Sequence, residues 1–591
     1  MRILAKKSVL STLAAVMALV LVIAACGSDE DEPTATPVPT AAPTAAPTAA
    51  APLAPTAVPT AAATRAPTAV PTPAPTPTPA SAIKDTTIVV ALDTLERELW
   101  LHHYGGSTMF NPRHAMFEEL AVWTPRFSEA RLAESWSVGS DSKSFTIKLR
   151  KGIKFHDGDE LIAEDVIKTY DLLYEREASH AGLSTIRPLL GTTQDEFRTN
   201  IRALDQYTVE MKSKIPYAHW LETIIGPVSA PFLVVNASLV NGVGTTEAAA
   251  KPVGTGPFKF DRHNKGQNIR VEAVANHWRK TPSVKFVDYQ IVPEFATQLA
   301  LVATVKADII NIAASQVAQA RRVGAKQVVD DAGYNVWYAL RGQIPETHKN
   351  YDGTLPWVDG KDPERAKKVR LALNLALDRK GIIDKLYGGI GQLSSQGACT
   401  FPGQPWSYGD PYAYDQAQAK QLLAEAGYAN GFELEIPIYD QASGPVGLGL
   451  HDVVADQWRQ IGVKVKTVPA DFTVFREILL NITQPKLTYY WYCNFSDPDP
   501  MRYYNFFYHV ANPVWFGSTV LEPLLDKANA GLTAEQRREP ILAINKYFRD
   551  NHYWVPMFVL PKLYATSQRI DKWPLVSGHL RVHNLEHLTI N

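Results

Sequence analysis

The sequence predicts an α/β protein, and three observations lead to this prediction. Strand patterns, in which apolar residues recur at every second position, alternate along the chain with helix patterns, in which they recur every three to four positions. Residue types that begin and end helices separate these patterns. In the second half, strand, helix and strand follow one another, which implies a parallel sheet because parallel neighbours need a crossover connection.

The first half contains two predicted strands and a helix. Residues 144–150 alternate between apolar and polar side chains and predict a strand. Residues 153–156 follow a Lys-Gly turn and predict a second, returning strand. The next segment has helical spacing, so we expect a helix that buries one face, formed by Val166, Tyr170 and Leu173.

The second half is more regular. Asp362 and Pro363 have the residue types of a helix N-cap and first turn, so a helix is expected to begin there. Asp415 predicts the N-cap of another helix, and Gly427 predicts its end. A strand, a helix and a parallel strand are then predicted at 432–438, around Val454, Trp458 and Ile461, and at 463–468.

Residues 1–25 have the parts of a secretory signal: a basic start, an apolar run and small residues at its end. The apolar run, 9–25, is at the lower limit for a membrane-spanning helix, which needs about 17–25 residues. Ile23-Ala24-Ala25-Cys26 resembles the bacterial lipobox, so we expect cleavage before Cys26 and lipid on its sulfur. The alternative is an uncleaved N-terminal helix with an incidental cysteine.

Residues 26–82 are predicted to be a lipid anchor followed by a disordered tether. An acidic run at 29–32 leads into repeats of Pro, Thr and Ala that have almost nothing to bury. Such a segment favours extended polyproline II at about 3.1 Å per residue, so the tether could reach on the order of 100 Å. The folded body is expected to begin at Ile83, and it is long enough for about three ordinary domains.

The composition argues against several classes of function. The formal net charge of −1 lacks the basic footprint of a nucleic-acid binder. The sequence contains no HExxH, GxSxG, Walker or CxxC motif, although this does not exclude carboxylate catalysis. His102-His103 could begin a metal site, but no third ligand is visible, and a solvated or core pair is the alternative. We expect no cofactor and no metal.

Several segments of the body, in order along the chain, resemble those of a known protein family. They are Arg131-Leu-Ala-Glu-Ser-Trp136, Phe145-Thr-Ile-Lys-Leu-Arg-Lys-Gly-Ile-Lys-Phe-His-Asp-Gly158, Ala163-Glu-Asp-Val166, Pro252-Val-Gly-Thr-Gly-Pro-Phe258, Val369-Arg-Leu-Ala-Leu-Asn-Leu-Ala-Leu-Asp-Arg379 and Ala419-Lys-Gln-Leu-Leu-Ala-Glu-Ala-Gly-Tyr428. Together they resemble the family 5 solute-binding proteins, the oligopeptide, dipeptide and nickel receptors of ABC importers.

This resemblance implies a two-lobed periplasmic-binding-protein fold of type II, in the large peptide-receptor subclass. The first lobe would span 83–335, with an inserted subdomain at about 116–250. The second lobe would span 336–555, and residues 556–591 would return to the first. A ligand would be enclosed between the lobes. The Gly-Thr-Gly turn within 252–258 is expected to be structural, because a strand rather than a helix follows it.

The resemblance also implies where the ligand binds. Peptide-binding relatives carry an aspartate at the position of Asn494, where its carboxylate pairs with the free ammonium of the peptide. An asparagine accepts hydrogen bonds but supplies no charge to balance a desolvated cation. Either another acid substitutes for it, or the ligand lacks a free ammonium.

Aromatic residues surround this position in the sequence. By the resemblance, Trp491 and Tyr492 precede the ligand-contacting residue, Phe472 lies over the ligand, and Trp406 belongs to a loop near the cleft. Core packing is the alternative for each of these aromatic residues. Tyr408 lies in the same loop as Trp406.

The cysteines leave two readings open. Besides Cys26, the chain contains only Cys399 and Cys493. In an oxidising compartment one bridge is plausible, and two unpaired buried cysteines are the alternative. Some relatives have a disulfide beside the ligand position, and Cys399 is the available partner for Cys493.

We therefore expect a receptor anchored to the outer face of the cell membrane by Cys26. It would act as a monomer, capture a small solute by closure of two lobes, and deliver it to an ABC permease. A peptide is the first candidate solute, and an oligosaccharide or a metal chelate is the alternative. Proteins of other classes on the same anchor, namely an extracellular hydrolase or a sensor or adhesin, remain alternatives.

Overall fold

The computed structural model describes most of the body. The chain separates into residues 1–66 and 67–591, and every described residue belongs to the second unit. The predicted signal, anchor and tether, with Cys26, lie outside the described residues. The described ranges are 83–95, 111–124, 127–175, 183–217, 220, 223–224, 233–397, 400–438, 449–470, 488–494, 500–501, 504–505, 508, 516–531, 533–575 and 582–591.

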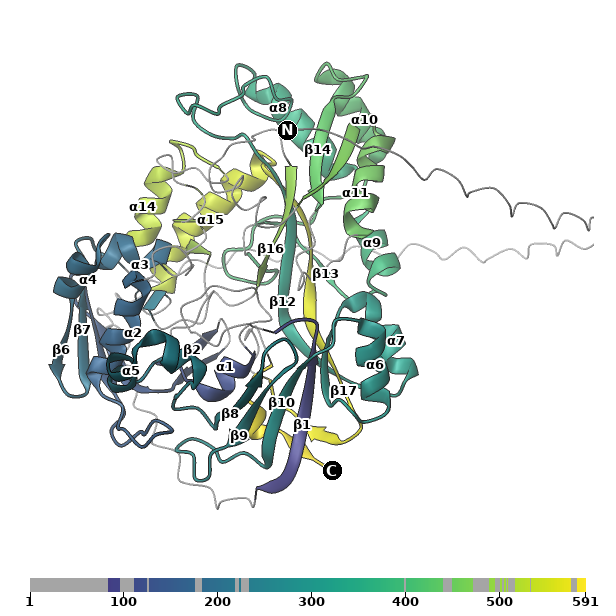
Figure 1. The fold of residues 1–591 in the computed structure, drawn as a ribbon. Helices are drawn as coiled ribbons and strands as arrows, with labels where there is room; N and C mark the ends of the chain where they lie inside the picture. Colours follow the sequence, from purple (N-terminus) through teal and green to yellow (C-terminus); the bar gives the residue numbers. More distant parts are fainter. Residues whose placement is uncertain are drawn as a thin grey trace, which may run out of the picture. The chain divides into compact units, whose positions relative to one another are not determined.

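A nine-stranded mixed sheet runs through the described body (Figure 1). Its strands lie in the order β16 (Thr488–Asn494), β12 (Lys326–Leu340), β17 (Trp554–Thr566), β11 (Ile309–Ile312), β1 (Lys84–Leu92), β10 (Val284–Ile291), β9 (Asn268–Ala273) and β8 (Phe258–Asn264), with β13 (Gln392–Leu393) also paired to β17. Strand β1 is parallel to β10 and β11, whereas β12 is antiparallel to both β16 and β17.

One core forms around the part of this sheet that holds β1, β8, β9 and β10. Ile88, Phe258, Val271 and Tyr289 are fully buried in it. The chain's last described segment, residues 582–591, adds Leu585 and Leu588 to the same core. The elements associated with this region are α1 (Asn111–Met116), α5 (Ala237–Ala250), β18 (Ile570–Lys572), η4 (Leu585–His587) and β19 (Thr589–Ile590). The buried apolar residues of α6 (Phe295–Ala303), η3 (Ala314–Gln316) and α7 (Val317–Arg322) belong to the largest core, which is described below.

A separate core lies between residues 120 and 234. It is built on a four-stranded antiparallel sheet whose strands lie in the order β4 (Ala133–Val138), β5 (Ser144–Leu149), β7 (Thr208–Lys212) and β6 (Ile201–Asp205). Phe145, Ile147 and Trp220 are fully buried in this core. The other elements of this region are the pair β2 (Ala121–Thr124) and β3 (Phe127–Ala130), with α2 (Ala163–Glu175), α3 (Leu183–Leu190) and α4 (Gln194–Asn200).

The third and largest core contains Ala91 of β1 and residues from Val302 to Ala565 of β17, and most of it lies C-terminal to residue 335. It surrounds the β12, β16 and β17 ladder, with helices on both sides: α14 and α15 on one, α9 and α11 on the other (Figure 1). The elements here are α8 (Pro363–Leu375), α9 (Arg379–Leu386), α10 (Gln416–Glu425), β14 (Glu433–Ile438), α11 (Gly449–Gln460), β15 (Lys464–Pro469), α14 (Glu522–Ala530) and α15 (Ala534–Asp550).

Most of the local predictions are confirmed. Helix α2 buries the predicted face, and strand β5 covers the predicted 144–150 segment to within one residue. Asp362 caps α8 by accepting a hydrogen bond from the Arg365 amide at 3.0 Å, and Asp415 caps α10 in the same way. Strands β14 and β15 are parallel neighbours joined through α11, which confirms the strand, helix and strand order.

The predicted returning strand at 153–156 is wrong. This segment is a tight loop closed by an isolated bridge between Lys154 and Glu160. Strand β5 pairs instead with β4 and β7, so both of its edges are already occupied. The His156 backbone amide donates to the Gly254 carbonyl at 2.9 Å, which directs the loop toward a distant part of the chain.

The turn at 254–256 is structural, as predicted. A Cβ at Gly254 would lie 2.2 Å from the Met116 carbonyl oxygen, and one at Gly256 would lie 2.5 Å from that of Ala115. Real Cβ contacts do not approach so closely, so only glycine lets this turn lie against the end of α1. Strand β8 begins two residues later, at Phe258.

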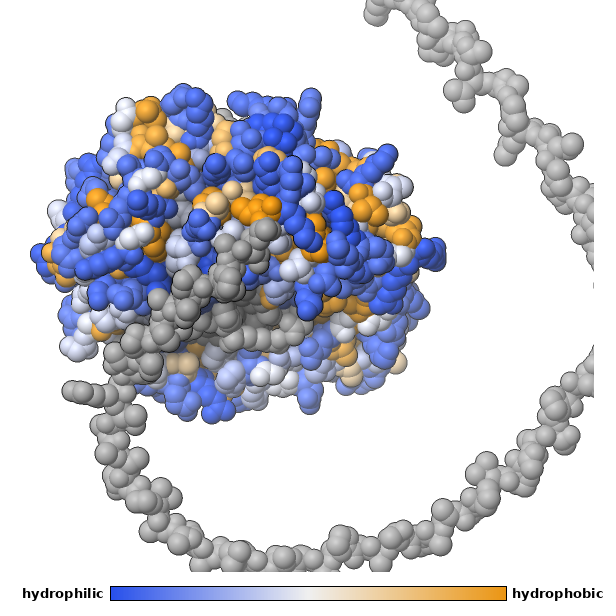
Figure 2. Space-filling view, turned by 90° about the horizontal axis from the view of Figure 1, so that it is seen from below, coloured by the Kyte–Doolittle hydropathy of each residue, from blue (hydrophilic) through white to orange (hydrophobic). Residues whose placement is uncertain are grey.

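Figure 2 shows hydrophilic residues over most of the coloured surface of one face, with hydrophobic residues in scattered patches. Among the described residues, no helix has the length and apolar character needed to cross a membrane.

Candidate functional site

The candidate solute-binding strand is β16, which pairs with β12 along its whole length. The register places Asn494 opposite Tyr334, Tyr492 opposite Val336, and Trp491 opposite Trp337. Because side chains alternate across a strand, even-numbered residues of both strands share one face and odd-numbered residues share the other. The ladder therefore has two faces with different surroundings.

The even-numbered face rests on helix α11. The Tyr338 hydroxyl lies 2.9 Å from His451 Nδ1, and the Tyr338 ring meets Trp458 edge-on at 5.8 Å between centroids. The Tyr490 ring lies 5.0 Å from the His451 ring. These contacts bury the middle of the ladder and hold β16 against helix α11.

Toward Asn494 the same face becomes more open. Tyr334 and Tyr492 are both partly exposed, and their rings meet edge-on at 5.4 Å. Tyr334 is the register partner of Asn494, so this aromatic pair adjoins the predicted ligand position. The structure does not describe the Asn494 side chain, and its backbone pairs with that of Tyr334.

The odd-numbered face also packs against the largest core. Trp337 is fully buried, and its partner Trp491 is partly buried against the same core. Helix α15 closes this side through Phe548, whose ring lies 5.4 Å from that of Trp554. Trp491 and Tyr492 thus lie on opposite faces of β16, three and two residues before Asn494, and both retain exposed surface.

Of the remaining predicted site residues, one is almost fully buried and the others are not described. Trp406 is 5 % exposed, and its indole Nε1 donates to Gln404 Oε1 at 3.0 Å, so core packing takes most of its surface. Phe472 and Cys399 lie outside the described residues, as does the side chain of Cys493. The ligand contact of Phe472 and the disulfide between Cys399 and Cys493 therefore stay predictions. His102-His103 also lies outside the described residues.

Two residues of the candidate site were missed by the sequence reasoning. One is Tyr334, which only the register with Asn494 brings to the site. The other is Asn335, which is fully buried and donates from Nδ2 to the carbonyls of Gln396 at 3.2 Å and Thr400 at 2.5 Å. An asparagine inside an apolar strand sequence was the available signal, because a buried amide needs hydrogen-bond partners.

Two grooves lie elsewhere in the body. One, of about 800 Å³, lies between α8 and α15 and is lined by Lys367, Tyr408, Tyr412, Arg549 and His552 among others. The other, of about 760 Å³, is lined by residues that include Lys154, Lys259, Asn276, Trp278 and Lys285. Neither groove is lined by Trp491 or Tyr492, so neither coincides with the candidate site.

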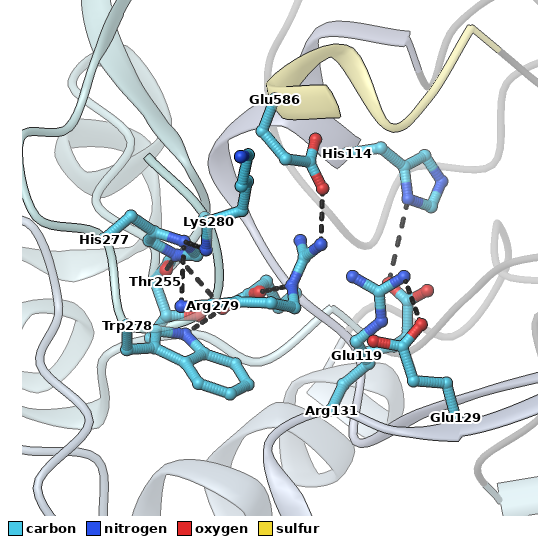
Figure 3. A network of polar contacts seen from close by, with 12 residues as sticks. His114, Glu119, Glu129, Arg131, Thr255, His277, Trp278, Arg279, Lys280 and Glu586 are labelled. Atoms are coloured by element: carbon cyan, nitrogen blue, oxygen red, sulfur yellow. Dashed lines mark hydrogen bonds and ion pairs between the residues drawn. The ribbon is translucent and has the colours of Figure 1, made fainter. Parts of the chain in front are cut away.

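A third cluster collects buried charges near α1 and the C-terminal segment (Figure 3). Arg279 lies at its centre: Nε donates to Glu118 Oε1 at 3.1 Å, and Nη1 bonds to Glu586. Trp278 Nε1 donates to Glu118 Oε2 at 2.8 Å. Arg131 pairs with Glu129 at 3.0 Å.

The pKa values of Glu118 and Glu586 indicate carboxylates paired with cations, whereas burial raises the pKa of the neighbouring Glu119. Burial by itself would raise the pKa of Glu118, but His277 and Arg279 beside it bring that pKa down to about 2. For Glu586, burial likewise would raise the pKa, but Arg279 brings it down to about 2. The enclosed cavity is about 30 Å³, which is water-sized. We read the cluster as a structural junction between residues 118–131, 277–279 and 586.

Metal binding finds no support in the described part of the chain. No group of three or more histidine, cysteine, aspartate or glutamate side chains there could hold an ion.

Comparison with known proteins places the chain in a family. The family model "Bacterial extracellular solute-binding proteins, family 5 Middle" matches residues 129–513. The chain belongs to this family. Its members are extracellular binding proteins, so the recognition of family 5 from the sequence is confirmed.

Curated relatives agree with this assignment. Heme-binding protein A of Haemophilus influenzae is 28 % identical over 459 residues, covering 73 % of this chain and 78 % of the relative. The dipeptide-binding protein of Escherichia coli K12 is 25 % identical over 384 residues, covering 62 % and 68 %. Di/tripeptide-binding protein 1 of Pseudomonas aeruginosa is 29 % identical over 372 residues, covering 57 % and 62 %.

Solved structures confirm the predicted two-lobed α/β fold. NikA from Brucella suis in complex with Fe(III)-EDTA matches with a TM-score of 0.72 at 18 % identity, covering 86 % of this chain and 100 % of that one. The dipeptide-binding protein from Pseudoalteromonas sp. SM9913 in complex with Met-Leu matches with a TM-score of 0.69 at 19 % identity and the same coverage.

The buried charge junction gives a prediction about stability. Replacing Arg279 with methionine keeps much of the side-chain volume but leaves Glu118 and Glu586 buried without their shared cation. We expect the free energy of unfolding to fall by about 3–5 kcal/mol in urea titrations. The control Lys380→Met removes an exposed i,i+4 pair with Asp384 and should cost at most about 0.5 kcal/mol. Equal effects of the two changes would contradict the structural role of the junction.

His451 gives a prediction about pH. Burial lowers its pKa from 6.5 to about 4, so the unfolded chain binds a proton at His451 between these pH values and the folded chain does not. Stability is therefore lost as pH falls from 6.5 to 4, by about 3 kcal/mol for this residue. His451→Gln should reduce the slope of unfolding free energy against pH over this window by about one proton. An unchanged slope would show that His451 is accessible to protons in the folded protein.

Proposed function

We propose that this protein is a membrane-anchored, extracytoplasmic solute-binding receptor of an ABC importer. It captures a peptide or a similar small solute by closure of two lobes and delivers it to the membrane permease. The observation that carries the proposal is the family match over residues 129–513, because this family consists of binding proteins. We further propose that the chain acts without catalysis and as a monomer.

The proposed domain bounds are those of the sequence analysis. Lobe I spans 83–335 with an inserted subdomain at about 116–250, lobe II spans 336–555, and 556–591 returns to lobe I. The distribution of buried residues supports this division: one core lies within 120–234, and another consists mostly of residues after 335. Leu585 and Leu588 pack in the core that contains β1, which supports the return of the C-terminal segment.

We propose that the solute binds at the end of β16, in contact with Asn494, Trp491 and Tyr492, with contributions from Phe472 and Trp406. The partial exposure of Trp491 and Tyr492 supports this assignment, as does the open aromatic pair that Tyr492 forms with Tyr334. The near-complete burial of Trp406 limits its contribution to the edge of its ring.

The residues at the end of β16 indicate which class of solute binds there. The named relatives bind haem, dipeptides and tripeptides, and one structural neighbour holds Fe(III)-EDTA. Asn494 brings no charge to a free ammonium, and aromatic faces beside a neutral amide suit apolar side chains or rings. A peptide whose amino terminus is not the main contact is therefore the first candidate. An oligosaccharide or a metal chelate is the second, favoured by the neutral Asn494.

We also propose a disulfide between Cys399 and Cys493. The backbone register supports it: Cys493 lies opposite Asn335, whose amide binds the carbonyl of Thr400, the residue after Cys399. Such a bridge would fix the 396–400 segment beside the solute strand. The redox conditions outside the cytoplasm favour its formation.

A thermal-shift screen tests the receptor proposal. A solute at 100 times its Kd stabilises the folded state by about 2.7 kcal/mol, which raises the melting temperature measurably. The screen should contain free and N-acetylated di- to pentapeptides, oligosaccharides, haem and metal chelates. We expect at least one class to raise the melting temperature in proportion to the logarithm of its concentration. If no class did so, the receptor proposal would be contradicted.

Asn494→Asp gives a sharper prediction for peptides. The added carboxylate should raise affinity for peptides with a free amino terminus by about tenfold or more, because a charged hydrogen bond contributes about 1.5–3 kcal/mol. Affinity for the matching N-acetylated peptides should not rise. Calorimetric titration measures both, and Asn264→Asp on an exposed part of β8 makes the same charge change away from the site. If neither peptide series responded to Asn494→Asp, this residue would lie outside the site.

Cys26→Ala tests the anchor. Without the sulfur there is no lipid attachment, and without several acyl chains the protein has no firm hold on a membrane. We expect the variant to leave the membrane fraction of bacterial cells and to lose the labelled fatty acid that the natural chain incorporates. Cys399→Ala, which removes a cysteine of the body, should change neither property. Retention of the Cys26→Ala protein in the membrane would indicate an uncleaved N-terminal helix.

A further inference from the structure

One end of the main sheet holds the starts of four of its strands. Lys84 of β1 pairs in parallel with Val284, the first residue of β10. Ile309 of β11 and Lys326 of β12 both pair with Thr566 of β17, one on each side of it. Strands β1, β10, β11 and β12 therefore begin at the same end, which is the lower end of the sheet in Figure 1.

Helices α6 and α7 both lead into strands that begin at this end. Helix α6 precedes β11, and α7 precedes β12. Because β11 and β12 lie on either side of β17, the turns after the two helices flank the same strand end. The candidate solute position lies elsewhere, since Tyr334, the register partner of Asn494, is roughly 20 Å along β12 from Lys326.

Three exposed cations at these turns are not paired with any described acid. Lys306 follows α6, and Arg321 and Arg322 belong to the last turn of α7. Arg321 Nη2 donates to the neutral side chain of Gln327, at 3.1 Å from its Oε1. Residues 304–308 and 321–325 are named the basic turns below.

The other charges near the basic turns are already engaged and leave this surface positive. Asp308 is 1 % exposed and accepts from Arg569 Nε at 3.0 Å. Lys326 Nζ donates to a backbone carbonyl of β18 at 2.7 Å. Asp571 and Lys572 follow in β18 and cancel each other in charge.

Two valines add apolar surface to the basic turns. Val305 and Val323 are 44 % and 38 % exposed. Val305 has a φ of 58°, in the left-handed region that a β-branched residue rarely adopts. After α7, the left-handed residue is Gly324, with a φ of 76°. The valine after α6 thus has both backbone strain and an exposed apolar side chain, and a glycine would have neither.

The predicted tether joins the body at the same end of the sheet. The body begins at Ile83, directly before β1. Ile83 also lines the groove of about 760 Å³, together with Lys154, Lys259 and Lys285. Of these lysines, Lys259 and Lys285 have acidic partners. The chain is therefore tethered at the end of the sheet that carries unpaired cations and exposed valines.

We propose that the basic turns dock the body on a membrane surface that carries anionic phospholipid headgroups. Such a surface attracts nearby Lys and Arg side chains, and exposed apolar side chains enter the boundary between headgroups and acyl chains. The tether brings this end of the sheet within reach of the membrane. Docking here leaves the candidate solute position roughly 20 Å along β12 from the basic turns. The inference rests on the proposed location at a membrane and not on the identity of the solute.

The test uses the full chain as cells make it, in vesicles of phosphatidylcholine alone or with about 30 % phosphatidylglycerol. A fluorophore at the exposed position Val329, near the start of β12, reports energy transfer to acceptor-labelled headgroups. A fluorophore at exposed Tyr414, before α10, is the reference. At low salt, we expect transfer from Val329 to be greater in anionic vesicles, with a smaller difference at Tyr414. At about 0.5 M salt the difference should disappear, because the charges are screened. Equal transfer in both kinds of vesicle at low salt would overturn the inference.

Two charge variants test the cations. The first replaces the three cations of the basic turns: Lys306→Gln, Arg321→Gln and Arg322→Gln. The matched control makes the same charge change at three other exposed lysines: Lys361→Gln, Lys420→Gln and Lys464→Gln. The ratio of docked to undocked protein should fall at least about tenfold in the first variant, because each charge near an anionic surface contributes about fivefold. In the control it should change by less than about twofold, because charges beyond the Debye length are screened. An unchanged ratio in the first variant would overturn the inference.

Val305→Gly tests the apolar contribution in a variant that suits the backbone. Glycine adopts a φ of 58° without strain, so the melting temperature should not fall. The ratio of docked to undocked protein should nevertheless fall about twofold or more, because apolar surface is lost from the contact. An unchanged ratio would overturn the role of Val305 in docking.

The same measurements separate this inference from the proposals before it. If the natural chain did not stay on neutral vesicles, the lipid anchor would be contradicted, and transfer from the free chain to anionic vesicles would still decide about docking. If the variant without the three cations reached anionic vesicles normally but lost import in cells, an acidic surface of the permease would be the partner. That result would overturn docking on lipid.

Discussion

The structure depends on one ladder of backbone hydrogen bonds, the pairing of β12 with β17. These strands are far apart in the sequence, and every other strand of the main sheet reaches one of them directly or through its neighbours. The largest core packs on both faces of this ladder, with Trp337 and Tyr338 at its centre. The same ladder carries the candidate solute-binding strand, β16, on one edge, so its geometry sets where Asn494 lies.

At the candidate site, the middle of the β16–β12 ladder is buried, and its end near Asn494 is partly exposed. Tyr338, His451 and Trp458 bury the middle of the β16–β12 ladder, and burial keeps His451 uncharged at neutral pH. Two residues further on, Tyr492 and Tyr334 are partly exposed, and the register then reaches Asn494. If the solute binds here as proposed, this arrangement favours solutes with apolar or neutral surface, because Asn494 itself supplies no charge to a desolvated ammonium.

Sequence patterns predicted local structure well where a single chemical signal decides it. Asp362 and Asp415 cap helices because their carboxylates satisfy free amides, and this requires only neighbouring residues. The error at 153–156 arose because pairing partners are chosen by the whole fold: β4 and β7 already occupy both edges of β5. Tyr334 was missed for the same reason, since only the long-range register brings it opposite Asn494.

The buried junction around Arg279 shows a further limit of sequence reasoning. Glu118, Arg279 and Glu586 are widely separated in the chain, and no spacing rule joins them. In the β12–β17 ladder, residues 331–333 lie opposite the single residue Pro561, and only the partner strand reveals this bulge. The family, by contrast, was accessible from the sequence, because several matched segments in one order are far more specific than any single motif.

The central claim, that this protein captures a small solute, is tested most directly by native mass spectrometry of the full chain purified gently from the cells that make it. The account predicts a population heavier than the processed chain by the mass of one small molecule, which denaturation releases and fragmentation then identifies as a peptide, sugar or chelate. A single species at the mass of the lipidated chain, unchanged after incubation with extracellular medium and all solute classes, would contradict it.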